Sequence, residues 1–258
     1  QANMRIIRAG LAALSVLHAG IVFLSIHRYG PATWLDGIAY VKAADALREG
    51  MWVDLIYWPP GYPLILAAGS LLTGLDPLPV AGYLNLLVIV AITLCAGMIT
   101  YRYVHTHWAV VLAGTVWMTT FSVPLFDFAV LVSTEPLFIL CIALFLLLAG
   151  MYRASPSRRN LLLLAAVCMT AVMLRYIGAA LVLAGVLVIA LDVPGRSARG
   201  AGQVHRLSGG DFLRRLLVFA GVSGIPIAAV LVRNTVISGG LFGERGESRL
   251  SLFDAAGD

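Results

Sequence analysis

The chain has 258 residues, of which 60% are hydrophobic and only 12% charged, and its mean hydropathy is +0.91. A soluble globular domain is about 45–50% apolar and about 25% charged, so this composition excludes a soluble fold and predicts an all-α protein that crosses a membrane several times. The net charge of +5 comes from basic residues spread along the loops, a distribution that does not indicate nucleic-acid binding.

Seven apolar segments are predicted to span the bilayer. They cover residues 4–26, 78–103, 107–125, 134–153, 159–174, 176–192 and 212–234. The apolar segment 61–73 is only about 13 residues long and reaches about 20 Å as a helix, so we expect it to lie in the outer interface.

The loops between these segments belong to one module, residues 1–258. The module has a long first outer loop with interfacial helices (27–77), a second outer loop (125–134), a cytoplasmic loop (193–211) and an outer segment (235–258). With the N-terminus in the cytoplasm, eleven arginines fall inside and seven basic residues outside, the asymmetry that cytoplasmic loops show. Most acids then lie outside, where we expect the chemistry. The predicted location is the plasma (inner) membrane.

The longest polar stretch in the first half of the chain runs from Asp36 to Pro63. Asp36 opens an amphipathic helix that is expected to lie in the membrane interface. Tyr40 follows one turn later on the same face, and Trp58 and Tyr62 stand among prolines that stiffen the backbone. Such a ledge suits a lipid-linked sugar. Asp36 is therefore a candidate catalytic base, and the alternative is a helix N-cap.

The second outer loop contributes two more acids. Glu135 follows Thr134 and precedes Pro136, so it is either an acid at a helix start or a second carboxylate that faces Asp36 across an outer cavity. Asp127 is a secondary candidate for substrate binding in the same loop.

Two arginines are expected at the outer ends of later helices. Arg175 precedes Tyr176, and Arg233 precedes Asn234. A pair of guanidinium groups there suits a phosphate, and the alternative for each arginine is an interfacial side chain that reaches toward water. Arg245, in the Gly-rich outer segment, is a further candidate for substrate binding.

These motifs, in this order, resemble the GT-C superfamily of integral-membrane glycosyltransferases, notably the bacterial relatives of protein O-mannosyltransferases and aminoarabinose transferases. The matching residues are Asp36 and Tyr40 with Ala44, Leu47 and Gly50, the motifs PPGYP (59–63), STEPLF (133–138) and RY (175–176), and RN followed by FG (233–234 and 242–243).

The resemblance implies a sugar donor carried on polyprenyl phosphate and an acceptor hydroxyl on a glycan, lipid or protein. It implies Asp36 as the general base of an inverting transfer, with arginines that stabilise the departing phosphate. Related enzymes often carry an acidic pair in the first loop, whereas Gly37 follows Asp36 here. This difference disfavours a divalent metal, and no cofactor is predicted. Members of this superfamily also usually have a further C-terminal module after the part that corresponds to residues 1–258.

Two other classes of function stay open. One is a flippase or transporter of a lipid-linked sugar, although such proteins usually carry repeated halves and ionisable groups near the bilayer midplane. The other is a non-catalytic membrane scaffold subunit that has kept the fold.

Overall fold

The computed structural model describes residues 2–51, 58–120, 123–191 and 209–241, and most of this part of the chain is helical. The elements are α1 (Ala2–Tyr29), α2 (Leu35–Arg48), α3 (Gly61–Thr73), α4 (Pro77–Tyr103), α5 (Trp108–Thr120), α6 (Val123–Val130), α7 (Glu135–Ala154), α8 (Arg158–Leu174), the short 3₁₀ helix η1 (Tyr176–Gly178), α9 (Ala179–Ala190) and α10 (Gly209–Ser238). The described residues contain no β-strand, only one isolated bridge between Ala32 and Leu131. The expected all-α fold is confirmed for them.

In the described part of the chain, four helices are long and apolar enough to cross a membrane: α1, α4, α7 and α10. They have 28, 27, 20 and 30 residues, and about 20 residues suffice for a bilayer core of about 30 Å. Half of the most apolar window of α4 is buried, whereas only 11% of that of α10 is. The helix α4 therefore forms the centre of the bundle, and α10 lies at its edge.

The remaining helices of the predicted spans have fewer than the about 20 residues that cross the bilayer core. The described part of the span expected over 107–125 lies in α5, which covers Trp108–Thr120, and in α6, which begins at Val123 and continues past the expected end to Val130. These two helices have 13 and 8 residues, α8 has 17 and α9 has 12. Four of the described helices thus reach the length of a span, and the count of seven stays a prediction.

Local sequence explains several of the observed helix ends. Pro77 starts α4 and Pro136 lies in the first turn of α7, where a missing N–H costs nothing. The α3 helix stops at Gly74, whose φ of +73° is the left-handed conformation that glycine adopts freely. The hydroxyl of Ser157 caps α8 by accepting a hydrogen bond from the Asn160 backbone N–H at 3.2 Å.

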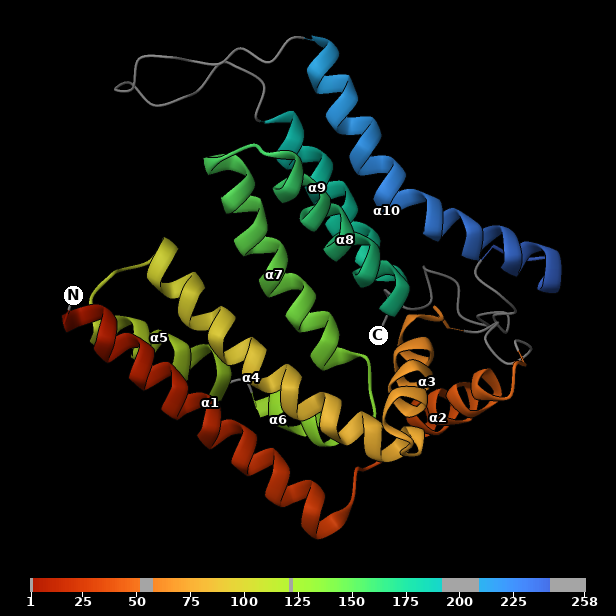
Figure 1. The fold of residues 1–258 in the computed structure, drawn as a ribbon, viewed down its shortest axis with the longest axis horizontal. Coiled ribbons are helices and arrows are strands. Elements are labelled where there is room, and N and C mark those ends of the chain that lie inside the picture. The colour runs from red at the N-terminus through yellow and green to blue at the C-terminus, as the bar shows by residue number, and fades with distance from the viewer. Residues whose placement is uncertain (1, 52–57, 121–122, 192–208, 242–258) are drawn as a thin grey trace, which may run out of the picture.

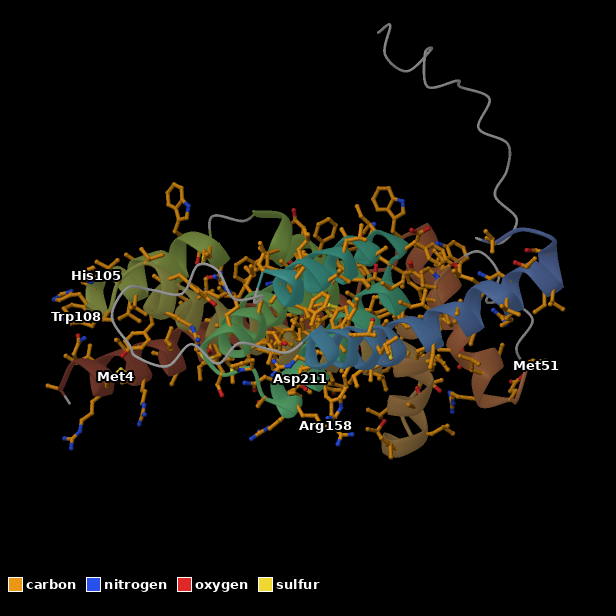
Figure 2. All side chains as sticks on the ribbon, turned by 90° about the horizontal axis from the view of Figure 1, so that it is seen from above. Met4, Met51, His105, Trp108, Arg158 and Asp211 are labelled. Atoms are coloured by element: carbon orange, nitrogen blue, oxygen red, sulfur yellow. The ribbon has the colours of Figure 1, made fainter. Side chains whose placement is uncertain are left out.

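The long helices run back and forth between two ends of the bundle (Figure 1). At one end, which we call the α2 end, α2 and α3 lie beside the starts of α4 and α7 and the last turn of α8. At the opposite end lie the start of α1 and the turn between α7 and α8. Figure 2 labels Met51 near the first end and Met4, His105 and Trp108 near the second. There, Asn3 donates to the Thr106 carbonyl at 2.6 Å and accepts from the Trp108 N–H at 3.0 Å.

The last helix, α10, contains Pro226 in its interior, and its ribbon bends along its length in Figure 1. A proline inside a helix removes one backbone hydrogen bond and kinks the axis. The half of α10 beyond the proline extends past the last turn of α8, toward the α2 end.

Candidate functional site

The candidate site lies at the α2 end, and its acid Asp36 is in the first turn of α2. The N-cap of α2 is Trp34, and no side chain caps this end. The alternative of Asp36 as N-cap is therefore wrong. Its carboxylate is exposed, and it lies where the helix dipole favours a negative charge.

Backbone contacts hold α2 against the segment that precedes α7. A Cβ atom on Gly37 would lie 2.6 Å from the carbonyl oxygen of Val132, a distance that only glycine permits. Ala32 joins the same segment: its N–H donates to the Val130 carbonyl, and its carbonyl accepts from the Val132 N–H, both at 2.9 Å. The two outer loops predicted from the sequence are thus fixed side by side. This packing supplies a structural reason for Gly37.

A buried asparagine strengthens this arrangement. The Asn85 amide, on α4, donates to the carbonyls of Ala129 at 3.0 Å and Leu131 at 2.8 Å. Two carbonyls, one in the last turn of α6 and one just after it, are therefore satisfied away from water, which stabilises the end of this helix inside an apolar bundle.

Three aromatic side chains pack together at the site: Tyr40 and Trp58 line its pocket, whereas the predicted Tyr62 is fully buried behind Tyr40 and does not. Tyr40 is buried, and its ring meets Trp58 and Tyr62 edge-on, with centroid distances of 5.8 and 5.2 Å. Such pairs stabilise packing by about 0.5–1.5 kcal/mol beyond area burial. Burial, then the nearby Asp36 carboxylate, raises the pKa of Tyr40 to about 12, although the Thr134 hydroxyl opposes the shift. Burial likewise raises the pKa of Tyr62. Both phenols remain neutral at physiological pH.

The positive charge of the site is Arg175, which follows the last helical residue of α8. Its guanidinium forms an ion pair with Glu135 and donates to the Thr134 hydroxyl at 3.2 Å. Glu135 is thus the partner of the predicted arginine, and it is itself the first residue of α7. Neither side chain is fully buried, since Arg175 is 40% and Glu135 29% exposed.

Glycines bring three backbone segments together around Arg175. A Cβ atom on Gly61, the first residue of α3, would lie 2.4 Å from the Met173 carbonyl oxygen. One on Gly178 would lie 2.4 Å from the carbonyl carbon of Ala171. The end of α8 is therefore packed directly against the start of α3 and against η1. This close packing fixes the position of the Arg175 backbone.

These elements enclose a pocket of about 530 Å³. Its lining residues are Asp36, Tyr40, Trp58, Pro59, Leu174, Arg175, Tyr176 and Ile177. The pocket thus offers a carboxylate that can accept a proton, a guanidinium that can bind an anion and aromatic rings that can stack on a sugar. It has the size and the mixed lining of a small-molecule site.

An apolar crevice begins at two of the same residues, Pro59 and Tyr176. It continues between α8 and α10, lined by Val172, Met173, Ile227, Val230 and Leu231. With a volume of about 10 Å³ it is a narrow surface feature rather than a cavity. It shares Pro59 and Tyr176 with the polar pocket, and its other lining residues are apolar side chains of two helices.

The predicted second arginine does not line this pocket. Arg233 donates to the Asn234 side-chain oxygen at 3.4 Å, and buried Asn234 donates to the Tyr176 hydroxyl at 3.0 Å. Among the described residues, Arg233 is therefore linked to the pocket through Asn234 and Tyr176. The expectation that Arg233 forms one anion site together with Arg175 has no support in this arrangement.

The remaining predicted residues lie elsewhere. Asp127 is exposed on α6 and does not line the pocket, and Arg245 lies outside the described residues.

Two residues of the site, Thr134 and Leu174, were not predicted from the sequence. Thr134 stands beside the predicted Glu135, but nothing in the sequence indicates which arginine its hydroxyl meets. Within the described ranges, no three His, Cys, Asp or Glu side chains form a group that could hold a metal ion.

Comparisons of the chain with protein-family models, with curated proteins and with solved structures found no match.

Proposed function

We propose that the chain is a membrane glycosyltransferase that moves a sugar from a polyprenyl-phosphate carrier to an acceptor hydroxyl, with Asp36 as general base. The observation that carries the proposal is that Asp36 and Arg175 line one pocket with Tyr40 and Trp58. A transfer of this kind needs a base for the acceptor and a cation for the leaving phosphate, and aromatic rings suit a sugar.

The proposed step is a single displacement at the anomeric carbon. The acceptor oxygen forms a bond to this carbon while its proton passes to the Asp36 carboxylate. The bond from the anomeric carbon to the phosphate oxygen breaks, and its electron pair leaves with the polyprenyl phosphate. Because the attack comes from the face opposite the leaving group, the anomeric configuration is inverted. Arg175 stabilises the negative charge that develops on the phosphate.

The apolar crevice supports a lipid-linked donor over a free nucleotide sugar. It starts at Pro59 and Tyr176 on the pocket wall and follows α8 and α10. Of these helices, α10 is one of the four that can cross a membrane. A phosphate held by Arg175 would direct its polyprenyl chain along this path into the lipid. The sugar would then remain in the polar pocket.

The same proposal includes the architecture and orientation. In it, α5 with α6, α8 and α9 complete the seven crossings of a GT-C-like module, in spite of their short lengths. The N-terminus is cytoplasmic, and the α2 end faces the outside of the plasma membrane. Arginines near the opposite end support this orientation, since Arg102, Arg153, Arg158 and Arg159 lie in or beside the turns there.

The test is sugar transfer by the protein reconstituted in vesicles. Polyprenyl phosphates that carry labelled sugars serve as donors, and a cell-envelope fraction serves as acceptor. We expect Asp36→Asn to lower turnover at least about a hundredfold, the size of effect that general-base catalysis supplies. Asp45→Asn is the matched control, because Asp45 lies on the same helix but pairs with Arg48 outside the pocket.

Two outcomes would contradict the proposal. Equal turnover by the Asp36→Asn variant and the unmodified protein would exclude Asp36 as the general base. Passage of a lipid-linked sugar across the vesicle without any new glycoside would indicate a transporter instead.

A further inference from the structure

A second pocket lies at the opposite end of the bundle, between the starts of α8 and α10. Its volume is about 210 Å³, and its lining residues are Pro156, Ser157, Arg158, Leu161, Asp211, Arg214, Arg215 and Val218. Figure 2 labels Arg158 and Asp211, which come from different helices and lie close together in that view. The proposed transfer reaction uses none of these residues.

We infer that this pocket binds the headgroup of an anionic phospholipid. Three arginines and one aspartate line it, so the lining residues carry a formal charge of +3 − 1 = +2. Guanidinium groups bind phosphate oxygens through paired, charge-assisted hydrogen bonds. One water needs only about 10–15 Å³ of such space, so the pocket has room for a group of phosphate size.

The spacing along α10 shows that the charges form one face. Along this helix, Arg214, Arg215 and Val218 follow Asp211 by three, four and seven positions. This spacing places all four residues on a single side of the helix. This face begins polar and ends apolar as α10 enters the bundle. A phospholipid has the same polarity from headgroup to chain.

One arginine of the pocket is held in position by a buried residue. Arg215 donates to the Tyr152 hydroxyl at 3.0 Å, and its guanidinium lies 5.9 Å from the centroid of the Tyr152 ring. Tyr152 is fully buried in α7. The pocket is therefore supported from beneath by a third helix. Arg158 and Arg214 are exposed at its rim, where a ligand can meet them.

A lipid fits the surroundings better than a soluble anion. Leu213 and Leu217, on the adjacent face of α10, are 55% and 62% exposed. Exposed leucines beside the arginines suit acyl chains at the edge of a bilayer. Leu161 and Val218 give the pocket an apolar wall as well. In the proposed orientation this end is cytoplasmic, where the leaflet carries negative lipids.

The experiment measures lipid binding by the purified full chain in detergent. The probes are short-chain phosphatidylglycerol, short-chain phosphatidylcholine and inorganic phosphate, and the readout is the concentration dependence of thermal stabilisation. We expect phosphatidylglycerol to bind more tightly than phosphatidylcholine, and inorganic phosphate to give no comparable stabilisation. Arg158→Gln and Arg214→Gln should each weaken phosphatidylglycerol binding about fivefold.

Arg159→Gln is the matched control. Arg159 is exposed and adjacent in sequence to Arg158 but does not line the pocket, so its loss should leave the affinity unchanged. Equal weakening by Arg159→Gln would mean that only diffuse surface charge attracts lipid, and would overturn the inference. Equal stabilisation by inorganic phosphate would also overturn it, in favour of a soluble anion. Melting temperatures without lipid verify that each variant is folded.

This inference stands apart from the proposed transfer reaction. Arg158→Gln should leave sugar transfer intact when lipid is supplied in excess, because the residue lies at the end opposite the Asp36 pocket. Failure of either proposal therefore leaves the other open to its own test.

Discussion

Arg175 carries a charge that Glu135 already partly neutralises. Replacing Glu135 with Gln keeps the shape of the side chain and removes its charge, so Arg175 should bind an anion more strongly. We expect Glu135→Gln to tighten polyprenyl-phosphate binding about fivefold, as measured by displacement of a fluorescent lipid phosphate, since a partly exposed ion pair contributes about 0.2–1 kcal/mol.

Two control variants accompany the Glu135→Gln measurement. Asp127→Asn, on exposed α6, should leave the affinity for polyprenyl phosphate unchanged. Arg175→Gln should weaken binding strongly. If Glu135→Gln weakened binding as much as Arg175→Gln does, Glu135 would be a ligand of the substrate rather than a partner of the arginine.

Tyr40 gives a prediction about pH. Its pKa is about 12 in the folded protein, against an ordinary value of about 10. The contribution of the neutral phenol to stability is thus fully present below pH 10 and is lost as the pH rises toward 12. We expect the unfolding midpoint to fall over this interval, and to fall less in Tyr40→Phe. An equal fall in both proteins would show that Tyr40 does not titrate as described.

At the scale of the elements, the close approach of backbones at the site predicts which glycines are essential. Gly61→Ala sets a methyl group against the Met173 carbonyl, and Gly37→Ala sets one against the Val132 carbonyl. Each should destabilise the protein by about 1–3 kcal/mol, because a backbone cannot move aside as a flexible side chain can. Unfolding in denaturing detergent measures the change.

The matched control is Gly20→Ala within α1. A Cβ atom there meets nothing within 4 Å, so alanine should stabilise the helix by about 0.5–1 kcal/mol. Loss of stability in all three variants would mean that the close contacts at Gly37 and Gly61 have no special effect.

The crevice between α8 and α10 gives a prediction about donor length. Val230→Trp should fill the crevice and raise the KM for a long-chain polyprenyl donor about tenfold, while a short-chain donor is affected little. Val236→Trp is the control, because Val236 is 80% exposed on the same helix and does not line the crevice. Equal effects on donors of both lengths would exclude the crevice as the chain path.

Much of the fold is predictable from the sequence at this scale. The apolar runs and their flanking Pro and Gly residues predicted α3 over 61–73 as observed, and α4 and α7 to within one residue at each end. The extension of α6 to Val130, past the end expected at residue 125, was missed. A hydrophobic pattern shows which residues avoid water, and it does not show where a helix stops.

The site was less predictable than the helices for a related reason. Asp36, Tyr40, Trp58, Arg175 and Tyr176 were predicted, and they do line one pocket. The partner of Arg175 was not predicted, since Glu135 is 40 positions away and their meeting depends on how α7 and α8 pack. The same applies to Arg233, which donates to Asn234 and is not among the residues that line the pocket.

At the scale of the whole molecule, the alternation of helices between two ends predicts which loops face the same side of the membrane. A cysteine at Ser155, in the turn between α7 and α8, should react with an impermeant thiol reagent only from the cytoplasmic side. A cysteine at Thr73, at the end of α3, should react only from the outside. The native cysteines Cys95, Cys141 and Cys168 are buried and supply a low background. Labelling of both positions from one side would contradict the orientation.

The most direct measurement is an experimental structure with a polyprenyl-phosphate sugar bound. The proposal predicts the phosphate within hydrogen-bond distance of the Arg175 guanidinium, the sugar against Tyr40 and Trp58, and the Asp36 carboxylate facing the anomeric carbon from the side opposite the phosphate. A phosphate bound elsewhere, with Arg175 still paired only to Glu135 and Thr134, would contradict it.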